Sequence, residues 1–217
     1  MTERPIAILF DLDGTLVDTI ELIMQSMEFA FAEFTGVRPT REQWLRGLGI
    51  PLRKQITEHA RSSEELDVLI ARYRLFQGEH HDAMTTAYPG VANVLNALSG
   101  RGHPMGLVTS KYFATAKKAL VHTGIDAHIS VVIGADSTPN QKPHPEPVLT
   151  AIAQLKTEPA RALFVGDSPH DIAAGNAAGV ATVAATWGPF PRADLEAAHP
   201  THWLASIEAL PDLVNRV

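Results

Sequence analysis

The sequence predicts an α/β fold, with a doubly wound parallel sheet and an inserted all-helical domain. Five short, uninterrupted apolar runs are typical of strands buried on both faces. They span residues 6–10, 105–109, 130–134, 162–166 and 180–185. Helical patterns separate most of these runs, and strands that alternate with helices form a parallel, Rossmann-like sheet. The alternation stops between residues 18 and 87, where only helical patterns occur.

The composition is that of an ordinary globular protein. The 217 residues are 45% hydrophobic and 19% charged, which is enough for one core domain and a smaller insertion. A net charge of −6 argues against nucleic acid as the main partner, because phosphate backbones are bound by clustered Lys and Arg. The absence of cysteine excludes disulfides, thiolate catalysis and cysteine-based zinc sites.

No apolar stretch approaches the roughly 18 residues needed to cross a bilayer, and the first residues lack the apolar segment of a signal peptide. We therefore expect no membrane partner and a cytoplasmic location.

The first half of the chain contains one strand followed by helices. After the strand at residues 6–10, apolar residues recur at helical spacing from residue 19 to 34, and Gly36 follows as a stop signal. Shorter helical patterns cover residues 42–45 and 52–59. A longer one covers residues 64–77, and Ser62 with Glu65 predicts a capping box at its start.

The second half alternates strands with helices. The predicted helices cover residues 91–98, 113–122, 147–155, 171–178 and 207–214. Gly124 and Gly179 follow two of them and are expected to end them. We therefore expect a core domain of residues 1–17 and 88–217 and a helical domain of residues 18–87.

Two carboxylates follow the first strand directly. Asp11 and Asp13 place negative charge in one turn, and such charge is costly unless a hard cation or a proton compensates it. Gly14 allows the backbone to turn tightly, and Thr15 adds a hydroxyl group. The same short pattern occurs in hairpin turns and calcium loops, so it does not identify a function by itself.

Further polar residues follow the other strands. Thr109, Ser110 and Lys111 follow the second strand, Asp167 and Asp171 follow the fourth, and Lys142 lies in a proline-rich loop after the third. Each has a purely structural alternative: helix capping for the hydroxyls, a solvated loop for the lysine, and a turn or helix-dipole role for the aspartates. Since the carboxyl ends of parallel strands share one edge of the sheet, we expect these groups to meet there.

Four motifs in this order resemble those of the haloacid dehalogenase superfamily of phosphatases. They are residues 11–17, Thr109, Lys142, and residues 166–171. The helical insertion resembles the C1 type of cap found in that superfamily. Residues 134–136, 142–147, 171–179 and 186–188 resemble the phosphoglycolate phosphatase branch or the related pyrophosphatase branch. Ser110 departs from the Asn that commonly stands at this position in phosphoglycolate phosphatases.

The resemblance implies a magnesium-dependent phosphatase that hydrolyses a small phosphomonoester through an aspartyl-phosphate. Asp11 would be the nucleophile and Asp13 the general acid and base, while Thr109 and Lys142 would bind and neutralise the phosphoryl group. Mg²⁺ would be held by the carboxylates of Asp11 and Asp167 and the backbone carbonyl of Asp13. Asp171 would support the ion directly or through water.

Substrate contacts are expected from both domains. Ser110 and Lys111 are candidates for further phosphate contacts. In the helical domain, residues 47–51 are the expected loop over the site, and Arg46 and Arg53 are candidate anchors for a carboxylate or second phosphate, with a surface role as the alternative. His80, His81 and Asp82 superficially suggest a metal cluster, but adjacent histidines on a helix do not face one point.

Several functions remain open at this stage. The substrate is expected to be a small phosphorylated metabolite, phosphoglycolate first, with inorganic pyrophosphate or a sugar phosphate as alternatives. A phosphomutase and a non-catalytic phosphate-binding module are alternatives of other classes, although no motif residue is missing. Dehalogenation is disfavoured by the second aspartate and by the motif at residues 166–171, and hydride transfer by the lack of a glycine-rich nucleotide loop. Either a monomer or a homodimer is compatible with the sequence.

Overall fold

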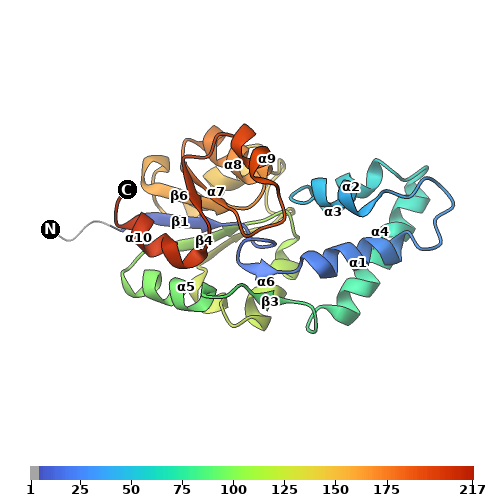
Figure 1. The fold of residues 1–217 in the computed structure, drawn as a ribbon, viewed down its shortest axis with the longest axis horizontal. Coiled ribbons are helices and arrows are strands. Elements are labelled where there is room, and N and C mark those ends of the chain that lie inside the picture. Colours follow the sequence, from blue (N-terminus) through green and yellow to red (C-terminus); the bar gives the residue numbers. More distant parts are fainter. Residues whose placement is uncertain (1–4) are drawn as a thin grey trace.

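The computed structural model describes residues 5–217, so residues 1–4 of the expected core domain, and the expectation about a signal peptide there, lie outside the described part. Six strands form one sheet in the order β5-β4-β1-β6-β7-β8, and every pairing is parallel (Figure 1). The strands are β1 (Ala7–Phe10), β4 (Met105–Val108), β5 (Val131–Ile133), β6 (Ala162–Gly166), β7 (Ala181–Ala185) and β8 (His202–Leu204). The predicted doubly wound α/β fold is confirmed.

Strand β1 lies inside the sheet and is buried on both faces. Ile8 and Phe10 join the cluster that contains α5 (Val91–Gly100), α6 (Phe113–His122) and α10 (Leu210–Val214). Ala7 and Leu9 join the opposite cluster, with α7 (Glu146–Gln154) and α8 (Pro169–Ala178). Alternate side chains of β1 therefore pack into hydrophobic clusters on opposite faces of the sheet. This explains why every residue of this strand is apolar.

The second group of helices lies beside the sheet domain. It consists of α1 (Ile20–Ala30), α2 (Arg41–Arg46), α3 (Leu52–Thr57) and α4 (Ser63–His80), and we call residues 18–87 the helical region (Figure 1). These helices pack around a hydrophobic cluster of their own, which includes Met27, Phe31, Trp44 and Tyr73. The helical region thus has a hydrophobic cluster separate from those that flank the sheet.

The chain enters and leaves the helical region through a small two-stranded sheet. Strands β2 (Val17–Asp18) and β3 (Thr86–Ala87) pair antiparallel, which corrects the expectation that residues 18–87 contain no strand. Two residues are too few to show an alternating pattern in the sequence. The pairing holds together the two connections between the sheet domain and the helical region.

Several element boundaries differ from those predicted. Helix α1 ends at Ala30, four residues early. At the start of α4, Ser62 accepts a hydrogen bond from the Glu65 amide, but the Glu65 carboxylate binds Arg61 instead of completing the predicted capping box. Strand β8 and helix α9 (Arg192–Ala197) were not predicted, and the last predicted helix begins as a 3-10 turn, Ile207–Ala209.

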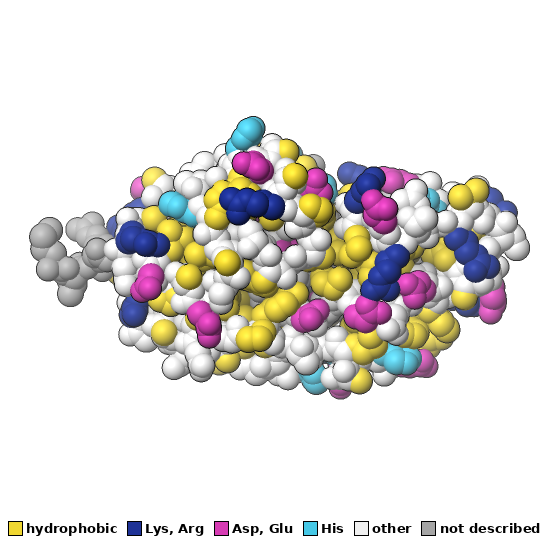
Figure 2. Space-filling view, viewed as in Figure 1, with side chains coloured by type: hydrophobic (Ala, Val, Ile, Leu, Met, Phe, Trp, Pro, Cys, Tyr) yellow, Lys and Arg dark blue, Asp and Glu magenta, His cyan; other side chains and the backbone are white. Residues whose placement is uncertain are grey.

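The surface carries charges of both signs. On the face shown in Figure 2, Lys and Arg side chains are interspersed with Asp and Glu among the described residues, and they do not form a basic stripe. Of the helices within residues 5–217, none combines the length and apolar character required to cross a membrane.

Candidate active site

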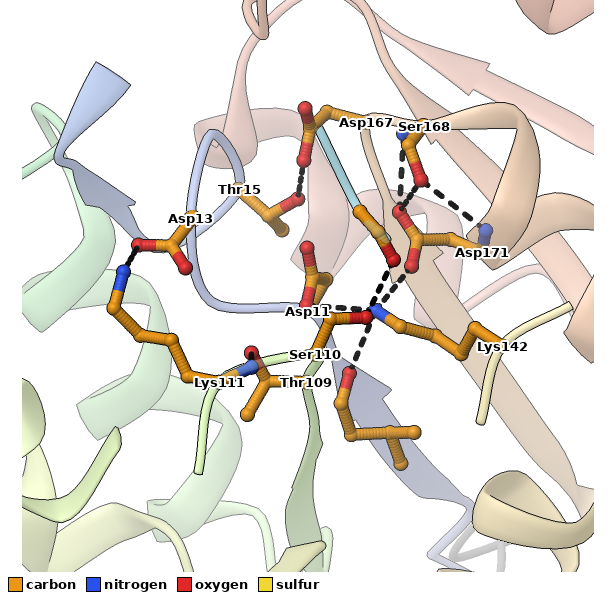
Figure 3. A network of polar contacts seen from close by, with 12 residues as sticks. Asp11, Asp13, Thr15, Thr109, Ser110, Lys111, Lys142, Asp167, Ser168 and Asp171 are labelled. Atoms are coloured by element: carbon orange, nitrogen blue, oxygen red, sulfur yellow. Dashed lines mark hydrogen bonds and ion pairs between the residues drawn. The ribbon is translucent and has the colours of Figure 1, made fainter. Parts of the chain in front are cut away.

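Three strand ends place polar side chains at one edge of the sheet. Asp11 follows β1, Thr109 follows β4 and Asp167 follows β6, and all three side chains are buried (Figure 3). The parallel register pairs Phe10 with both Leu107 and Val165. Because these three strands are neighbours in register, the residues that follow them emerge together, as the sequence led us to expect.

Lys142 joins these strand ends from the loop before α7. Its ammonium donates to Asp11 Oδ1 at 2.8 Å, to Asp171 Oδ1 at 2.5 Å and to the Val108 carbonyl at 3.1 Å (Figure 3). These three bonds match the three protons of the ammonium. The side chain is buried, so the alternative of a solvated loop lysine is excluded. Although burial opposes it, the charges of Asp11 and Asp171 raise the pKa of Lys142.

Asp171 has two structural roles at once. It is the third residue of α8 and forms a capping box with Ser168, whose amide and hydroxyl donate to Asp171 Oδ2 at 3.0 and 2.7 Å. The other carboxylate oxygen accepts from Lys142. A Cβ at Gly166 would overlap the Asp171 side chain, so the glycine that ends β6 allows the carboxylate to approach the strand.

Asp167 is fixed by the turn that contains the first motif. The Thr15 hydroxyl donates to Asp167 Oδ1 at 2.7 Å. Gly14 has a φ of +83°, and a Cβ there would overlap the Asp167 carboxylate, as would one at Gly188. Two glycines distant in sequence therefore leave room for one buried aspartate.

The buried carboxylates form a cluster with excess negative charge. Oxygens of Asp11, Asp167 and Asp171 all lie within 4.8 Å of one another, and Lys142 neutralises only part of their charge. Burial raises the pKa of Asp11 to about 7, and it raises the pKa of Asp167 well above its usual range, with the neighbouring carboxylates adding to both effects. Three hard oxygen donors with uncompensated charge fit a divalent cation such as Mg²⁺.

Asp13 stands apart from this cluster. Its carboxylate accepts a hydrogen bond from the Lys111 ammonium (Figure 3). It also accepts one from the Thr19 hydroxyl, and it lines the adjoining cavity. Its side chain is thus held away from the three clustered carboxylates. Thr19 was not identified from the sequence, because a threonine at the start of a helix is most simply interpreted as a cap.

Thr109 and Ser110 do not cap the following helix. Helix α6 has Tyr112 as its N-cap residue and no side-chain cap, which excludes that alternative. The Thr109 hydroxyl accepts from the Lys111 amide at 3.2 Å. The Ser110 hydroxyl donates to the carbonyl of Gly49 in the helical region at 2.5 Å, so in this structure it contacts the loop at residues 47–51.

A cavity of about 570 Å³ separates the strand ends from the helical region. Asp11, Asp13 and Asp167 lie at its floor, and residues 48–51 of the predicted loop line it. Much of the remaining wall is apolar, with side chains from both the helical region and the sheet domain. It includes Ile23, Met27, Leu48, Ile50, Leu52 and Phe190.

The two predicted arginine anchors differ in position. Arg53 lines the cavity and pairs with Asp67 at 2.9 Å. Arg46 pairs with Glu42 at 2.6 Å, its side chain is 72% exposed, and it is not among the described residues that line the cavity. The structure therefore does not bring Arg46 to the cavity.

Helix α4 contributes cavity residues that the sequence analysis missed. Tyr73, Arg74 and Gln77 of this helix line the cavity, as does His81, the residue that directly follows it. In the sequence they are part of an ordinary amphipathic helix, and no local signal separates a cavity wall from a surface. The ring of His80 stacks on Phe76, whereas His81 pairs with Asp82 through Nδ1, so the two adjacent histidines make different contacts.

Comparison with known proteins agrees with this geometry. The family model of haloacid dehalogenase-like hydrolases matches residues 8–185. The chain is 37% identical over 216 residues to a protein of Bacillus velezensis named pyrophosphatase PpaX, covering 99% of this chain and 98% of that protein. It is 38% identical over 208 residues to the pyrophosphatase PpaX of Anoxybacillus flavithermus, covering 96% of this chain and 94% of that one.

Among solved structures, the fold is similar to that of a predicted phosphoglycolate phosphatase from Haemophilus somnus. The TM-score is 0.87 at 26% sequence identity, and the alignment covers 96% of this chain and 97% of the other. A hydrolase from Pseudomonas syringae superposes equally well, with a TM-score of 0.87 at 19% identity over 98% of this chain and 99% of that chain. The second likeness concerns the fold alone.

Proposed function

This chain belongs to the haloacid dehalogenase-like hydrolase family and is a phosphatase. On that premise we propose that it hydrolyses a small phosphomonoester through an aspartyl-phosphate at Asp11, with Mg²⁺ as its metal. The observation that carries this proposal is the position of Lys142, whose ammonium contacts both Asp11 and Asp171 beside Asp167. A buried cluster of this kind fits phosphoryl transfer, because that reaction depends mainly on positioning and on neutralising charge.

Mg²⁺ would be held by the three clustered carboxylates together with one backbone carbonyl group. They are Asp11 and Asp167, the backbone carbonyl of Asp13, and Asp171 directly or through water. When bound, the ion supplies neutralisation of charge between the anionic nucleophile and the anionic phosphoryl group.

In the first step, a carboxylate oxygen of Asp11 attacks phosphorus and the bond from phosphorus to the leaving oxygen breaks. Asp13 donates a proton to that oxygen, so the product alcohol leaves neutral. Lys142 holds the Asp11 carboxylate through its 2.8 Å bond, and the Thr109 hydroxyl donates to a phosphoryl oxygen. Ser110 and Lys111 stand beside Thr109 as further candidates for phosphoryl contacts.

In the second step, water attacks phosphorus of the aspartyl-phosphate and transfers a proton to Asp13. The bond from phosphorus to the Asp11 oxygen breaks, which releases phosphate and restores the Asp11 carboxylate and the protonated Asp13 carboxyl group. Lys111 and Thr19 fix the Asp13 side chain on the cavity side of the cluster. The same carboxyl group can therefore serve the leaving oxygen first and the water afterwards.

The helical region, residues 18–87, acts as a cap domain on a core of residues 1–17 and 88–217. Its loop at residues 48–51 lines the cavity over the carboxylates, and the Gly49 carbonyl accepts the Ser110 hydroxyl. A cap in this position excludes bulk water during the first step and selects the leaving group.

Phosphoglycolate is the first substrate candidate, and inorganic pyrophosphate or a sugar phosphate is the alternative. The relatives named pyrophosphatase support pyrophosphate, whereas the structural neighbour described as a phosphoglycolate phosphatase supports phosphoglycolate. A phosphomutase would depend on a bisphosphate activator and return the phosphoryl group to a bound sugar phosphate.

A phosphate-release screen over these compounds, with Mg²⁺ and with a chelator, tests the proposal. We expect Mg²⁺-dependent release from at least one phosphomonoester, without a bisphosphate activator. Equal rates in Mg²⁺ and in chelator would reject the metal, and release from none of the compounds would reject the phosphatase.

Replacing Asp167 with Asn will separate metal binding from folding. Without metal, the variant should melt several degrees above the wild type, because one of three crowded buried carboxylates becomes neutral while Asn Oδ1 can still accept the Thr15 hydroxyl. Adding Mg²⁺ should raise the melting temperature of the wild type and leave the variant unchanged. Equal stabilisation of both proteins by Mg²⁺ would show that Asp167 is not a ligand.

A further inference from the structure

We propose that Arg74 binds a second anionic group, a carboxylate or a phosphate, on the carbon skeleton of the substrate's leaving group. This inference rests on the proposed function, since it concerns the same cavity. Arg74 lies on α4 and lines the cavity whose floor carries Asp11, Asp13 and Asp167. These are the only carboxylates among the described lining residues, so negative charge is confined to the floor.

The other cations that line this cavity all have carboxylate partners. The pairs are Arg53 with Asp67 at 2.9 Å, Lys118 with Asp82 at 3.3 Å, and Lys111 with Asp13. Within residues 5–217, Arg74 forms neither an ion pair nor a side-chain hydrogen bond. An anion in the cavity could therefore pair with Arg74 without breaking an existing ion pair. Pairing with any of the other three cations would compete with the carboxylate that each already contacts.

The guanidinium of Arg74 is held by an aromatic ring from the sheet domain. Its Cζ lies 5.4 Å from the centroid of the Tyr112 ring. A cation–π contact takes up no N–H group in a hydrogen bond to an acceptor, so two N–H groups of the guanidinium can donate in parallel to a carboxylate or phosphate. Because Tyr112 directly precedes α6 whereas Arg74 belongs to the helical region, this contact joins the two walls of the cavity.

The adjacent part of α4 adds a neutral donor. Tyr73 is buried, and its hydroxyl oxygen accepts from Gln77 Nε2 at 3.1 Å. No acceptor for the Tyr73 proton is present among the described residues, which leaves the proton available for a substrate oxygen. Burial raises the pKa of Tyr73, and the charge of Asp13 adds to this effect, so the hydroxyl remains protonated at neutral pH.

The size and chemistry of the cavity indicate what lies between the phosphoryl group and Arg74. Its volume of about 570 Å³ lies within the roughly 300–1,000 Å³ of pockets that enclose organic ligands. Ile23 and Met27 line it together with other apolar side chains. Pyrophosphate has no carbon atoms to bury against such a wall, whereas an organic phosphate with a second anionic group matches the wall and the cation.

The test compares wild type, Arg74→Gln, Arg74→Lys and the control Arg41→Gln, an exposed arginine of the helical region that pairs with Glu21 and Glu28. The substrates are phosphoglycolate, a hexose bisphosphate, pyrophosphate and para-nitrophenyl phosphate, which has no second anionic group. We expect Arg74→Gln to lower kcat/KM about 10- to 100-fold, mainly through KM, on whichever of the first two is hydrolysed. On para-nitrophenyl phosphate the change should stay below about threefold, since no charge-assisted bond is lost.

Arg74→Lys should retain part of the selectivity, and Arg41→Gln should match wild type on every substrate. The kcat/KM values for phosphoglycolate and for the hexose bisphosphate show whether a carboxylate or a phosphate is preferred as the second anionic group. The inference about Arg74 would be overturned if Arg74→Gln lost equal activity on all substrates or lost none on any. It would also be overturned if the wild type had a higher kcat/KM for pyrophosphate than for both organic anions. None of these results would reject the proposed phosphatase function. Failure of the wild type to release phosphate even from para-nitrophenyl phosphate would reject the proposed function, and this inference with it.

Discussion

Replacing Asp11 with Asn will abolish turnover and leave the protein folded. An amide cannot form the aspartyl-phosphate, so kcat should fall by roughly four to six orders of magnitude, as in other enzymes that lose their covalent nucleophile. The fold should persist because Asn Oδ1 can still accept the Lys142 hydrogen bond now made at 2.8 Å. The substitution also removes a charge whose burial is unfavourable, as the raised pKa of Asp11 shows.

Phosphate release and a thermal melt, measured on the same preparation, check both parts of this prediction. Asp18→Asn is the matched control, because Asp18 is an exposed aspartate of the same segment and should keep full activity. Mass spectrometry of acid-quenched wild type should find the phosphoryl group on the peptide that contains Asp11. Activity of Asp11→Asn above about a tenth of wild type would be incompatible with a nucleophilic role.

Replacing Lys142 with Met will remove activity and also destabilise the fold. The substitution leaves Asp11 and Asp171 buried without their shared counter-charge, and an uncompensated buried charge costs about 3–5 kcal/mol. Urea unfolding without metal measures this loss. The control is Lys117→Met, which removes a half-exposed pair with Asp126 and should cost less than about 1 kcal/mol.

The loss of stability in Lys142→Met should depend on pH. Buried carboxylates without a cation have a pKa above the value of about 3.9 that they have in the unfolded chain, and for Asp11 the pKa is about 7 even with Lys142 present. The folded variant thus binds more protons than the unfolded chain, so its stability falls as pH rises from about 4 through 7. The difference from wild type should be larger at pH 8 than at pH 5, and a difference independent of pH would contradict this account.

The local sequence predicted the elements whose signals lie within a few residues. Strand β6 and helix α6 have the predicted boundaries, 162–166 and 113–122. Their limits are set by an apolar run and by a helical pattern followed by Gly124. Strand β8 was missed because its three residues form no such run, and the pairing that defines it is with β7, some 20 residues earlier.

The residues of the candidate site also fall into two groups, those that local sequence signals identify and those that they do not. Asp11, Asp13, Thr109, Lys142, Asp167 and Asp171 could be named from the sequence, since each follows or precedes a recognisable element. Thr19, Tyr73 and Arg74 could not, because their part in the site depends on how the helical region packs over the sheet. Ser110 was named for its hydroxyl, but the partner of that hydroxyl, Gly49, lies 61 residues away in the chain.

By itself, then, the sequence determined the α/β fold, the order of the strands along the chain and the residues that could carry phosphoryl chemistry. The fold and the strand order follow from local periodicity, and the meeting of the polar residues from the rule that parallel strands share one carboxyl edge. Their phosphoryl chemistry follows from the resemblance of the four motifs to those of the haloacid dehalogenase superfamily. Only the tertiary structure decided which carboxylates crowd together, which cations are already paired, and which side chains line the cavity. Those properties depend on distances between segments far apart in the chain, and no local pattern encodes such distances.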